Sequence, residues 1–178
     1  MTYLVWDGRA MVEVPVAAQE GEALVVPNVA VVLYDSPGRE RLLLQRRDKP
    51  GEPVRGLWEI PSGRWRAGES LREAALREAG EETGLEITEW LSGLTRTEAH
   101  SRRPIEAGRA IVSVGVESAY PALHVVVEAV AVGFPRPQKG ETADPGWFEV
   151  AVVRAMLASP LEFVEYAAAV LGETLGVG

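Results

Sequence analysis

A short acidic segment, residues 63–85, holds the side chains of this chain that are best suited to chemistry. It reads GRWRAGESLREAALREAGEETGL and contains five glutamates: Glu69, Glu73, Glu78, Glu81 and Glu82. On a helix the last three stand at i, i+3 and i+4, so their carboxylates project from one side. Like charges at these spacings repel one another, and the helix dipole disfavours anions near its C-terminal end. A bound cation would relieve both penalties.

Magnesium or manganese is the cation that this cluster favours. Carboxylate oxygens are hard ligands that suit these ions, and no Cys or His is interleaved to favour zinc. The alternative interpretation is a solvated helix face, in which Arg72 and Arg77 pair with the glutamates. The clustered glutamates alone leave both interpretations open.

A helix from about Leu71 to Thr83 is predicted to present these carboxylates. Ser70 is a good N-cap, and Glu73 three residues later completes a capping box. Gly84 can end the helix, because glycine enters the left-handed region without steric cost. A stripe of small and aliphatic residues at helical spacing can lie against a sheet, namely Leu71, Ala74, Ala75 and Ala79.

The spacing across the whole segment matches the Nudix box at every fixed position. Those positions are Gly63, Glu69, Arg77, Glu78, Glu81, Glu82 and Gly84, with Ala79 and Leu85 at the two aliphatic positions. The chain is therefore similar to Nudix hydrolases. The resemblance implies an α/β fold, an α-β-α sandwich with a mixed central sheet. It also implies hydrolysis of a nucleoside diphosphate linked to another moiety, with Mg²⁺ or Mn²⁺ as cofactor.

The same resemblance assigns roles to residues of the box. The metal would be held by the carboxylates of Glu78, Glu81 and Glu82 and by the carbonyl of Gly63. Arg77 would anchor the glutamates, and Glu69 would help to fix that arrangement. The base that deprotonates water would be a box glutamate such as Glu82, or an acid from the loop before Trp147. That loop offers Glu141, whose offset is the more family-like, and Asp144.

Several further residues have both a functional and a structural interpretation. Arg46 and Arg47 end a predicted strand, and alternation places only one of them on the cleft face, where it could contact phosphate. A loop with His100, Arg102 and Arg103 could close over the substrate or stay exposed. We expect structural roles for the other candidates: Trp58, Tyr34 and Phe134 in the core, and His124 as a satisfied core or edge histidine.

Composition is that of a globular protein with an acidic balance. The 178 residues carry a net charge of −8 and are 47% hydrophobic, which suits one domain with a substantial core. The negative charge argues against a nucleic-acid partner, although a metal and local arginines can still admit a small anion. With no cysteine, disulfides, thiol chemistry and cysteine-ligated zinc are excluded. Isoprenoid diphosphate isomerases share the implied fold, and the missing cysteine argues against that activity.

No segment predicts membrane insertion or a cleaved leader. The most apolar stretch, residues 122–134, is interrupted by His124 and Glu128 and is too short to span a bilayer. The first residues lack a basic leader followed by an apolar run and a cleavage site. We therefore expect a cytoplasmic protein with no membrane partner.

The elements that position the box divide into a hairpin, residues 1–23, and one domain, residues 24–178. The hairpin is predicted within residues 3–16, around Asp7-Gly8. Further strands are predicted at 24–34, 42–47, 57–60, 87–98, 110–116, 123–132 and 147–150. A C-terminal helix is predicted at 161–171, capped by Ser159 with Pro160 at its start.

The substrate is predicted less directly than the reaction. The N-terminal hairpin resembles extra strands with which ADP-ribose and sugar-nucleotide hydrolases dimerise, and WEIPSG resembles their pre-box sequence. These features favour ADP-ribose or another nucleotide sugar, and a homodimer. The first alternative is a nucleoside triphosphate, including oxidised ones, cleaved to monophosphate and pyrophosphate. A non-catalytic nucleotide-binding module is the second, and the retained box glutamates disfavour it.

Overall fold

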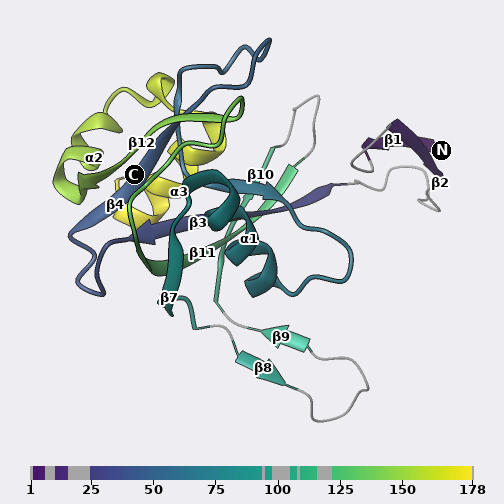
Figure 1. Cartoon of the computed structure of the whole chain (residues 1–178), viewed down its shortest axis with the longest axis horizontal. Helices are drawn as coiled ribbons and strands as arrows, with labels where there is room; N and C mark the ends of the chain where they lie inside the picture. The colour runs from purple at the N-terminus through teal and green to yellow at the C-terminus, as the bar shows by residue number, and fades with distance from the viewer. Residues whose placement is uncertain are drawn as a thin grey trace.

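The computed structural model describes residues 2–6, 11–15, 25–93, 95–97, 105–107, 109–115 and 122–177. Its elements, most of which are labelled in Figure 1, are β1 (Thr2–Trp6), β2 (Met11–Pro15), β3 (Val26–Tyr34), β4 (Arg41–Arg47), β5 (Trp58–Glu59), β6 (Ser62–Arg64), α1 (Leu71–Thr83), β7 (Glu86–Trp90), β8 (Thr95–Thr97), β9 (Ile105–Ala107), β10 (Ile111–Val114), β11 (Ala122–Val132), β12 (Thr142–Glu149), α2 (Val150–Met156), a 3₁₀ turn (Pro160–Glu162) and α3 (Glu165–Leu175).

A mixed eight-stranded sheet forms the centre of the fold. Its main path runs β10-β11-β3-β4-β12, with β5, β6 and β7 paired beside it. The long strands β3 and β11 are parallel, and the other pairs are antiparallel. Strands β10 and β7 pair with successive parts of the long strand β11. Such a sheet is the expected mixed arrangement.

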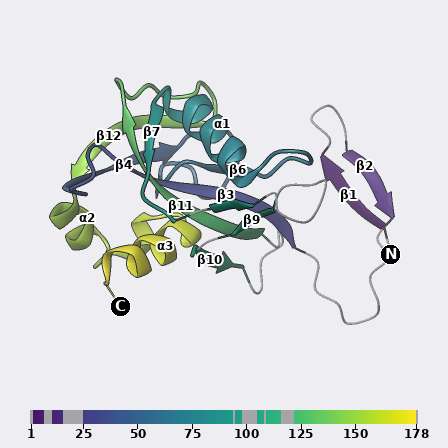
Figure 2. The ribbon, with the colours of Figure 1, turned by 90° about the horizontal axis from the view of Figure 1, so that it is seen from below.

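Helices cover both faces of this sheet, as Figure 2 shows with α1 on one side and α3 on the other. Strand alternation divides the core accordingly. On β3, Ala30, Val32 and Tyr34 pack in the cluster with α2 and α3. Val29, Val31 and Leu33 pack in the cluster with α1. The predicted α-β-α sandwich is confirmed.

A fork between β3 and β4 positions the beginning of the acidic segment. Among the described residues, the two strands pair in register only at Tyr34 and Leu42. Beyond that point β5 pairs with β4, and β6 pairs with β3. Val31 N–H donates to the Pro61 carbonyl across 2.9 Å, which fixes the turn between β5 and β6. Residues 58–64 therefore lie inside the fork, wedged between two central strands.

The predicted single strand at 87–98 is wrong, because the chain leaves the sheet after Trp90. The N–H groups of Leu91 and Ser92 both donate to the Glu128 carbonyl, at 2.9 and 3.1 Å. The Ser92 hydroxyl accepts the Glu128 N–H at 2.7 Å. This tight set of bonds ends β7, and β8 pairs with β9 in a separate small sheet.

Three other expectations differ from the structure. Phe134 is 89% exposed, because β11 ends at Val132 and Gly133 turns the chain with φ of 121°. The strand expected at 147–150 begins earlier, at Thr142. The C-terminal helix begins at Glu165, since Pro160 starts a short 3₁₀ turn instead.

The N-terminal residues form the expected antiparallel pair, β1 with β2, as a sheet of their own. Its turn at Asp7-Gly8 and the loop with His100, Arg102 and Arg103 lie outside the described residues. The role of the hairpin in dimerisation stays a prediction. Within the described ranges, every helix is too short or too polar to cross a membrane.

Candidate functional site

Helix α1 has the boundaries and caps that its sequence predicts. It runs from Leu71 to Thr83, and the Ser70 and Glu73 side chains form the reciprocal capping box. Gly84 takes the left-handed conformation at φ of 67° and donates its N–H to the Gly80 carbonyl. The predicted stripe of Leu71, Ala74, Ala75 and Ala79 is buried against the sheet. Burial of this small-residue stripe brings α1 close to β3 and the fork.

Arg77 is the centre of a charged network at the middle of α1. Its guanidinium contacts Glu69 through two bonds, Nε to Oε1 at 2.6 Å and Nη2 to Oε2 at 3.0 Å. It also donates to the carbonyl of Arg64 at 2.9 Å and to the carboxylates of Glu78 and Glu81. The bond from Arg77 holds the pKa of Glu69 below its usual range. A bidentate pair of this kind fixes the arginine in one orientation.

Glu78 lies directly against the backbone of Gly63. Its side chain is buried, and burial raises the pKa of its carboxyl group. A methyl group built on Gly63 would overlap the Glu78 carboxyl. Because Gly63 pairs with Val29 of the central strand β3, its backbone has no room to retreat. Only a glycine at this position lets β6 and the glutamate approach so closely.

Glu82 is the most deeply buried of the three candidate metal carboxylates. Its Oε2 accepts the Gln45 Nε2 at 2.6 Å and the Ser62 N–H at 3.2 Å. Burial, and secondly the charge of Glu59, raises the pKa of Glu82 to about 8. Residues from α1, β4 and β6 therefore meet at this one oxygen.

Sequence reasoning missed Glu59 and Gln45, which stand beside Glu82. Glu59 is 2% exposed, and its Oε2 lies 3.8 Å from Nη1 of Arg47. Its Oε1 lies 3.5 Å from the Gln45 Nε2, so one amide reaches both buried glutamates. Burial raises the pKa of Glu59 to about 7. Polar residues inside two otherwise apolar strands, in LLLQR and LWEIP, were the signal that could have revealed them.

Replacing Glu59 by Gln is expected to change how stability depends on pH. The folded pKa, about 7, lies above the unfolded value of 4.5. Its stabilising contribution is therefore fully present below pH 4.5 and is lost as the pH rises through 7. In metal-free protein, the free energy of unfolding of wild type minus Glu59→Gln should fall by about 3 kcal/mol between pH 4.5 and 7.5. Urea denaturation at several pH values measures this difference, and a constant difference would contradict the assignment.

The late loop that supplies Glu141 contacts the C-terminal end of α1. The hydroxyl of Thr142 donates to the carbonyl of Glu82 at 3.2 Å, and the Glu141 carbonyl accepts the Asp48 N–H at 2.8 Å. The Glu141 carboxylate is partly exposed and lies 3.7 Å from Nζ of Lys49. Asp144 sits in a bulge of β12 with φ of 46°. The structure thus brings the Glu141 loop to the candidate site.

The donor set fits a hard divalent cation in its chemistry. Glu78 and Glu82 are buried like charges with raised pKa values, and a cation between such groups would offset their repulsion. The described residues do not, however, bring three His, Cys, Asp or Glu side chains together as a ready metal cluster. Glu81 is exposed and lies 3.7 Å from Nη2 of Arg66. Two of the three carboxylates expected to hold the metal, Glu78 and Glu81, are thus in contact with arginines.

Arg46 and Arg47 face opposite sides of the sheet, as alternation predicts. The Arg46 guanidinium lies 3.8 Å from the ring centroid of Trp58, which is buried as expected. Arg47 faces the α1 side and binds Glu52 through two bonds, at 2.7 and 3.0 Å. Arg47 is therefore the arginine on the side of the buried glutamates.

The prediction that His124 is satisfied is wrong for one of its nitrogens. Its Nδ1 is buried and has no hydrogen-bond partner within the part of the chain that the structure describes. The imidazole instead stacks on Tyr166, with ring centroids 4.4 Å apart. Burial holds the pKa of His124 below its usual range.

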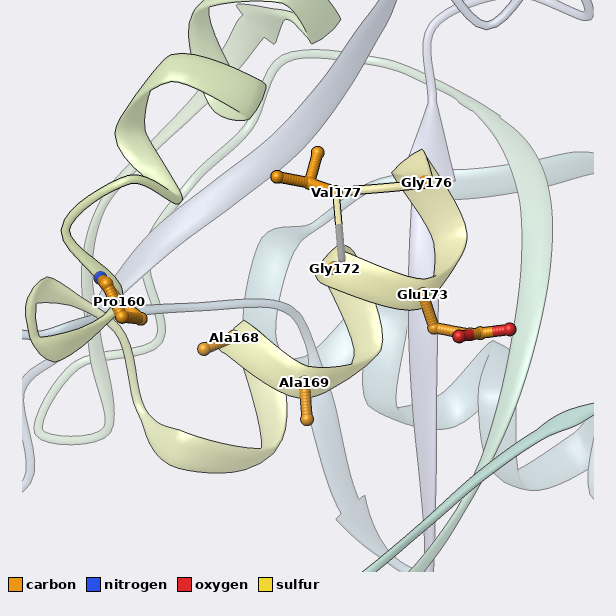
Figure 3. Close-up of a pocket in the computed structure, with 7 residues that line it drawn as sticks. All are labelled: Pro160, Ala168, Ala169, Gly172, Glu173, Gly176 and Val177. Atoms are coloured by element: carbon orange, nitrogen blue, oxygen red, sulfur yellow. The ribbon is translucent and has the colours of Figure 1, made fainter.

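A surface hollow on the outer side of α3 lies away from these residues. Figure 3 shows its lining residues on α3, with Ala168 nearer to Pro160 and Glu173 projecting on the far side. Glu173 is the one charged residue in its lining, and a single acid offers no support for a phosphate group. We do not assign substrate to this hollow.

The chain is similar to a known protein family, to curated proteins and to solved structures. The family model described as NUDIX domain matches residues 25–167. Octanoyltransferase of Myxococcus xanthus is 43% identical over 60 residues, which cover 34% of this chain and 16% of that protein. Putative 8-oxo-dGTP diphosphatase of Bacillus subtilis is 44% identical over 55 residues, or 31% of this chain and 33% of that protein. The chain thus spans a third or less of the length of these relatives.

The fold also matches solved structures. The NUDIX domain of Shewanella oneidensis NrtR, solved in complex with ADP ribose, has a TM-score of 0.53. The match covers 76% of this chain and 80% of that chain, with 18% sequence identity. At that identity the likeness shows the fold alone.

Proposed function

Because the chain belongs to the NUDIX domain family, we propose that it hydrolyses the diphosphate bond of a nucleoside diphosphate linked to another moiety. The observation that carries the proposal is the pair of buried carboxylates at the fork, Glu78 against Gly63 and Glu82 bound by the Ser62 N–H. Two buried acids at this position cost solvation energy, and a structural role alone would not require them.

Mg²⁺ or Mn²⁺ is the cofactor of the proposed reaction. The residues that would hold it are Glu78, Glu81 and Glu82, with the carbonyl of Gly63. A bound divalent cation neutralises diphosphate charge and lowers the pKa of water. Gln45 and Ser62 both bind Oε2 of Glu82, which orients that carboxylate for binding. Arg77 and Glu69 fix the helix against β6 through the Arg64 carbonyl.

Glu141 is the proposed general base. Its carboxylate is accessible, and the next residue, Thr142, contacts the backbone of Glu82. Glu141→Gln should lower turnover by more than about tenfold, because the amide cannot accept a proton from water. Mn²⁺ binding should be unchanged in the same variant. Steady-state rates and Mn²⁺ titration test this, with Asp144→Asn, at the other candidate acid in the bulge of β12, as the comparison. Near-normal turnover would exclude Glu141 as the base.

ADP-ribose or another nucleotide sugar is the proposed substrate. Three observations support it: the N-terminal strand pair β1–β2, the WEIPSG sequence before α1, and the solved NrtR domain with ADP ribose. The hairpin would also support a homodimer. A nucleoside triphosphate is the second candidate, because the matched Bacillus subtilis relative is named as an 8-oxo-dGTP diphosphatase.

A substrate panel with Mg²⁺ separates these candidates. ADP-ribose should yield AMP and ribose phosphate, whereas a triphosphate should yield a monophosphate and pyrophosphate. Chromatography of the products distinguishes the two reactions. Glu82→Gln, purified in the same way, serves as the low-activity control, because it removes a proposed metal ligand. If wild type binds nucleotide but cleaves no member of the panel, the non-catalytic binding module is favoured.

A further inference from the structure

The residues just before helix α3 pair with β5. In the sequence, β5 comes directly before the segment that contains Gly63. Phe163 forms a parallel bridge with Trp58, and the Val164 N–H donates to the Trp58 carbonyl at 2.8 Å. The 3₁₀ turn ends at Glu162, so this extended pair leads straight into the first turn of α3. Tyr166 in that turn is thereby brought against the segment between β5 and β6.

Tyr166 forms two hydrogen bonds with that segment. Its hydroxyl donates to the Ile60 carbonyl at 2.7 Å and accepts the Ser62 hydroxyl at 2.7 Å. Burial raises the pKa of Tyr166, so the phenol keeps its single proton for the bond to Ile60. The stacked ring of His124, from β11, supports the phenol from one face. Both polar capacities of the hydroxyl are thus used on the residues that lead to Gly63.

Ser62 is held from both layers of the sandwich. Its N–H donates to Glu82 of α1, and its hydroxyl donates to Tyr166 of α3. Between Ile60 and Ser62, the Pro61 carbonyl is bound by β3. Residues 60–62 are therefore anchored to three elements, α1, β3 and α3. These anchors leave the backbone at Gly63 little freedom to change direction.

We propose that Tyr166 is a positioning residue for the metal site. It fixes residues 60–63 so that the Ser62 N–H stays on Glu82 and the Gly63 backbone stays against Glu78, although it touches neither metal nor substrate. The proposal rests on the proposed function, because it assumes that Gly63 and Glu82 hold a divalent cation. It adds that α3, a helix outside the acidic segment, controls how well that cation is bound.

The test is the affinity of the intact protein for Mn²⁺, measured by electron paramagnetic resonance of the free ion. Tyr166→Phe should weaken Mn²⁺ binding by about tenfold, because loss of a group that orients a metal ligand typically costs about 10–100-fold in affinity, and Tyr166 acts through Ser62. Turnover of the variant should recover when Mn²⁺ is raised, with KM for the nucleotide unchanged at saturating metal. A purely structural tyrosine would lower the melting temperature without this metal dependence.

Tyr34→Phe is the matched control. Tyr34 is a buried tyrosine whose hydroxyl makes a 3.1 Å bond to Glu128, and its replacement likewise removes a phenolic hydroxyl. It lies at the C-terminal end of β3, beyond Val29, which pairs with Gly63. Its Mn²⁺ affinity should equal that of wild type. Ser62→Ala is the milder second variant, because it removes the bond to Tyr166 and keeps the N–H that binds Glu82. Its effect and that of Tyr166→Phe should not add in the double variant.

The outcomes separate the inference from the function on which it rests. If wild type binds Mn²⁺ and both Tyr166→Phe and Ser62→Ala bind it equally well, the positioning role is refuted and the proposed function stands. If wild type binds no Mn²⁺, both are refuted. Equal weakening in Tyr34→Phe would also overturn the inference, because the effect would then reflect general loss of stability.

Discussion

Glu82→Gln is expected to lower diphosphate hydrolysis by about 1,000-fold while the fold remains intact. The glutamine oxygen can still accept the two donors that hold Oε2, from Gln45 and Ser62. The second carboxylate oxygen, however, is replaced by an NH₂ group. The amide carries no charge, and its NH₂ group is a donor where a cation needs an acceptor. Structure is therefore conserved while metal binding is lost. Steady-state rates, Mn²⁺ titration and circular dichroism measure the three consequences.

Glu89→Gln is the control for this variant, because Glu89 is an exposed carboxylate on β7 outside the box. Its activity should equal that of wild type. A folded Glu82→Gln protein with normal turnover would show that Glu82 is not required for the reaction. The assignment of α1 as the metal-holding helix would then fail with it.

Gly63→Ala is expected to lower both Mn²⁺ affinity and turnover by about 100-fold. The added methyl overlaps the Glu78 carboxyl, and Gly63 cannot move away because β6 pairs with Val29 of β3. Glu78 must therefore leave its place, which removes one proposed ligand. Overpacking of this kind should also lower the free energy of unfolding by about 1–3 kcal/mol. Metal titration and urea denaturation measure the two effects separately.

Gly80→Ala is the matched control, since among the described residues no atom outside the adjacent helix backbone lies within 4 Å of the methyl that it would add. It should stabilise α1 by about 1 kcal/mol and leave turnover unchanged. The double variant Gly63→Ala/Glu78→Asp should recover stability, because the shorter acid makes room for the methyl. Its activity should stay low. Full activity in Gly63→Ala would show that the close approach of β6 to Glu78 is unimportant for the reaction.

Helix α1 was predictable because its determinants are local. Ser70, Glu73 and Gly84 act within a few residues of one another, so their spacing in the sequence is already their geometry. The buried stripe follows from helical periodicity in the same way. Glu82 could likewise be placed on the helix, but its partners could not. Gln45 stands 37 residues earlier than Glu82, in strand β4.

The fork was not predictable, because it depends on which strands pair over long distances. Residues 58–64 contain two strands of two and three residues, too short for any periodic signal. Their positions are set by hydrogen bonds to β3, to β4 and to Tyr166. Tyr166 lies more than 100 residues after Ile60, whose carbonyl it binds. The prediction that Phe134 lies in the core failed for a related reason. Its exposure follows from where β11 ends and not from its own hydrophobicity.

The fork also separates the residues proposed to hold the cation from a loop whose length can vary. Residues 48–56 leave β4 and return to β5, and this excursion is closed at its base by two main-chain bonds. Gly56 N–H donates to the Arg47 carbonyl at 2.7 Å, and Arg47 N–H donates to the Leu57 carbonyl at 3.0 Å. Doubling the length of such a loop costs only about 0.6 kcal/mol of closure entropy. Insertions there can evolve new contacts with a substrate while Gly63, Glu78 and Glu82 keep their places.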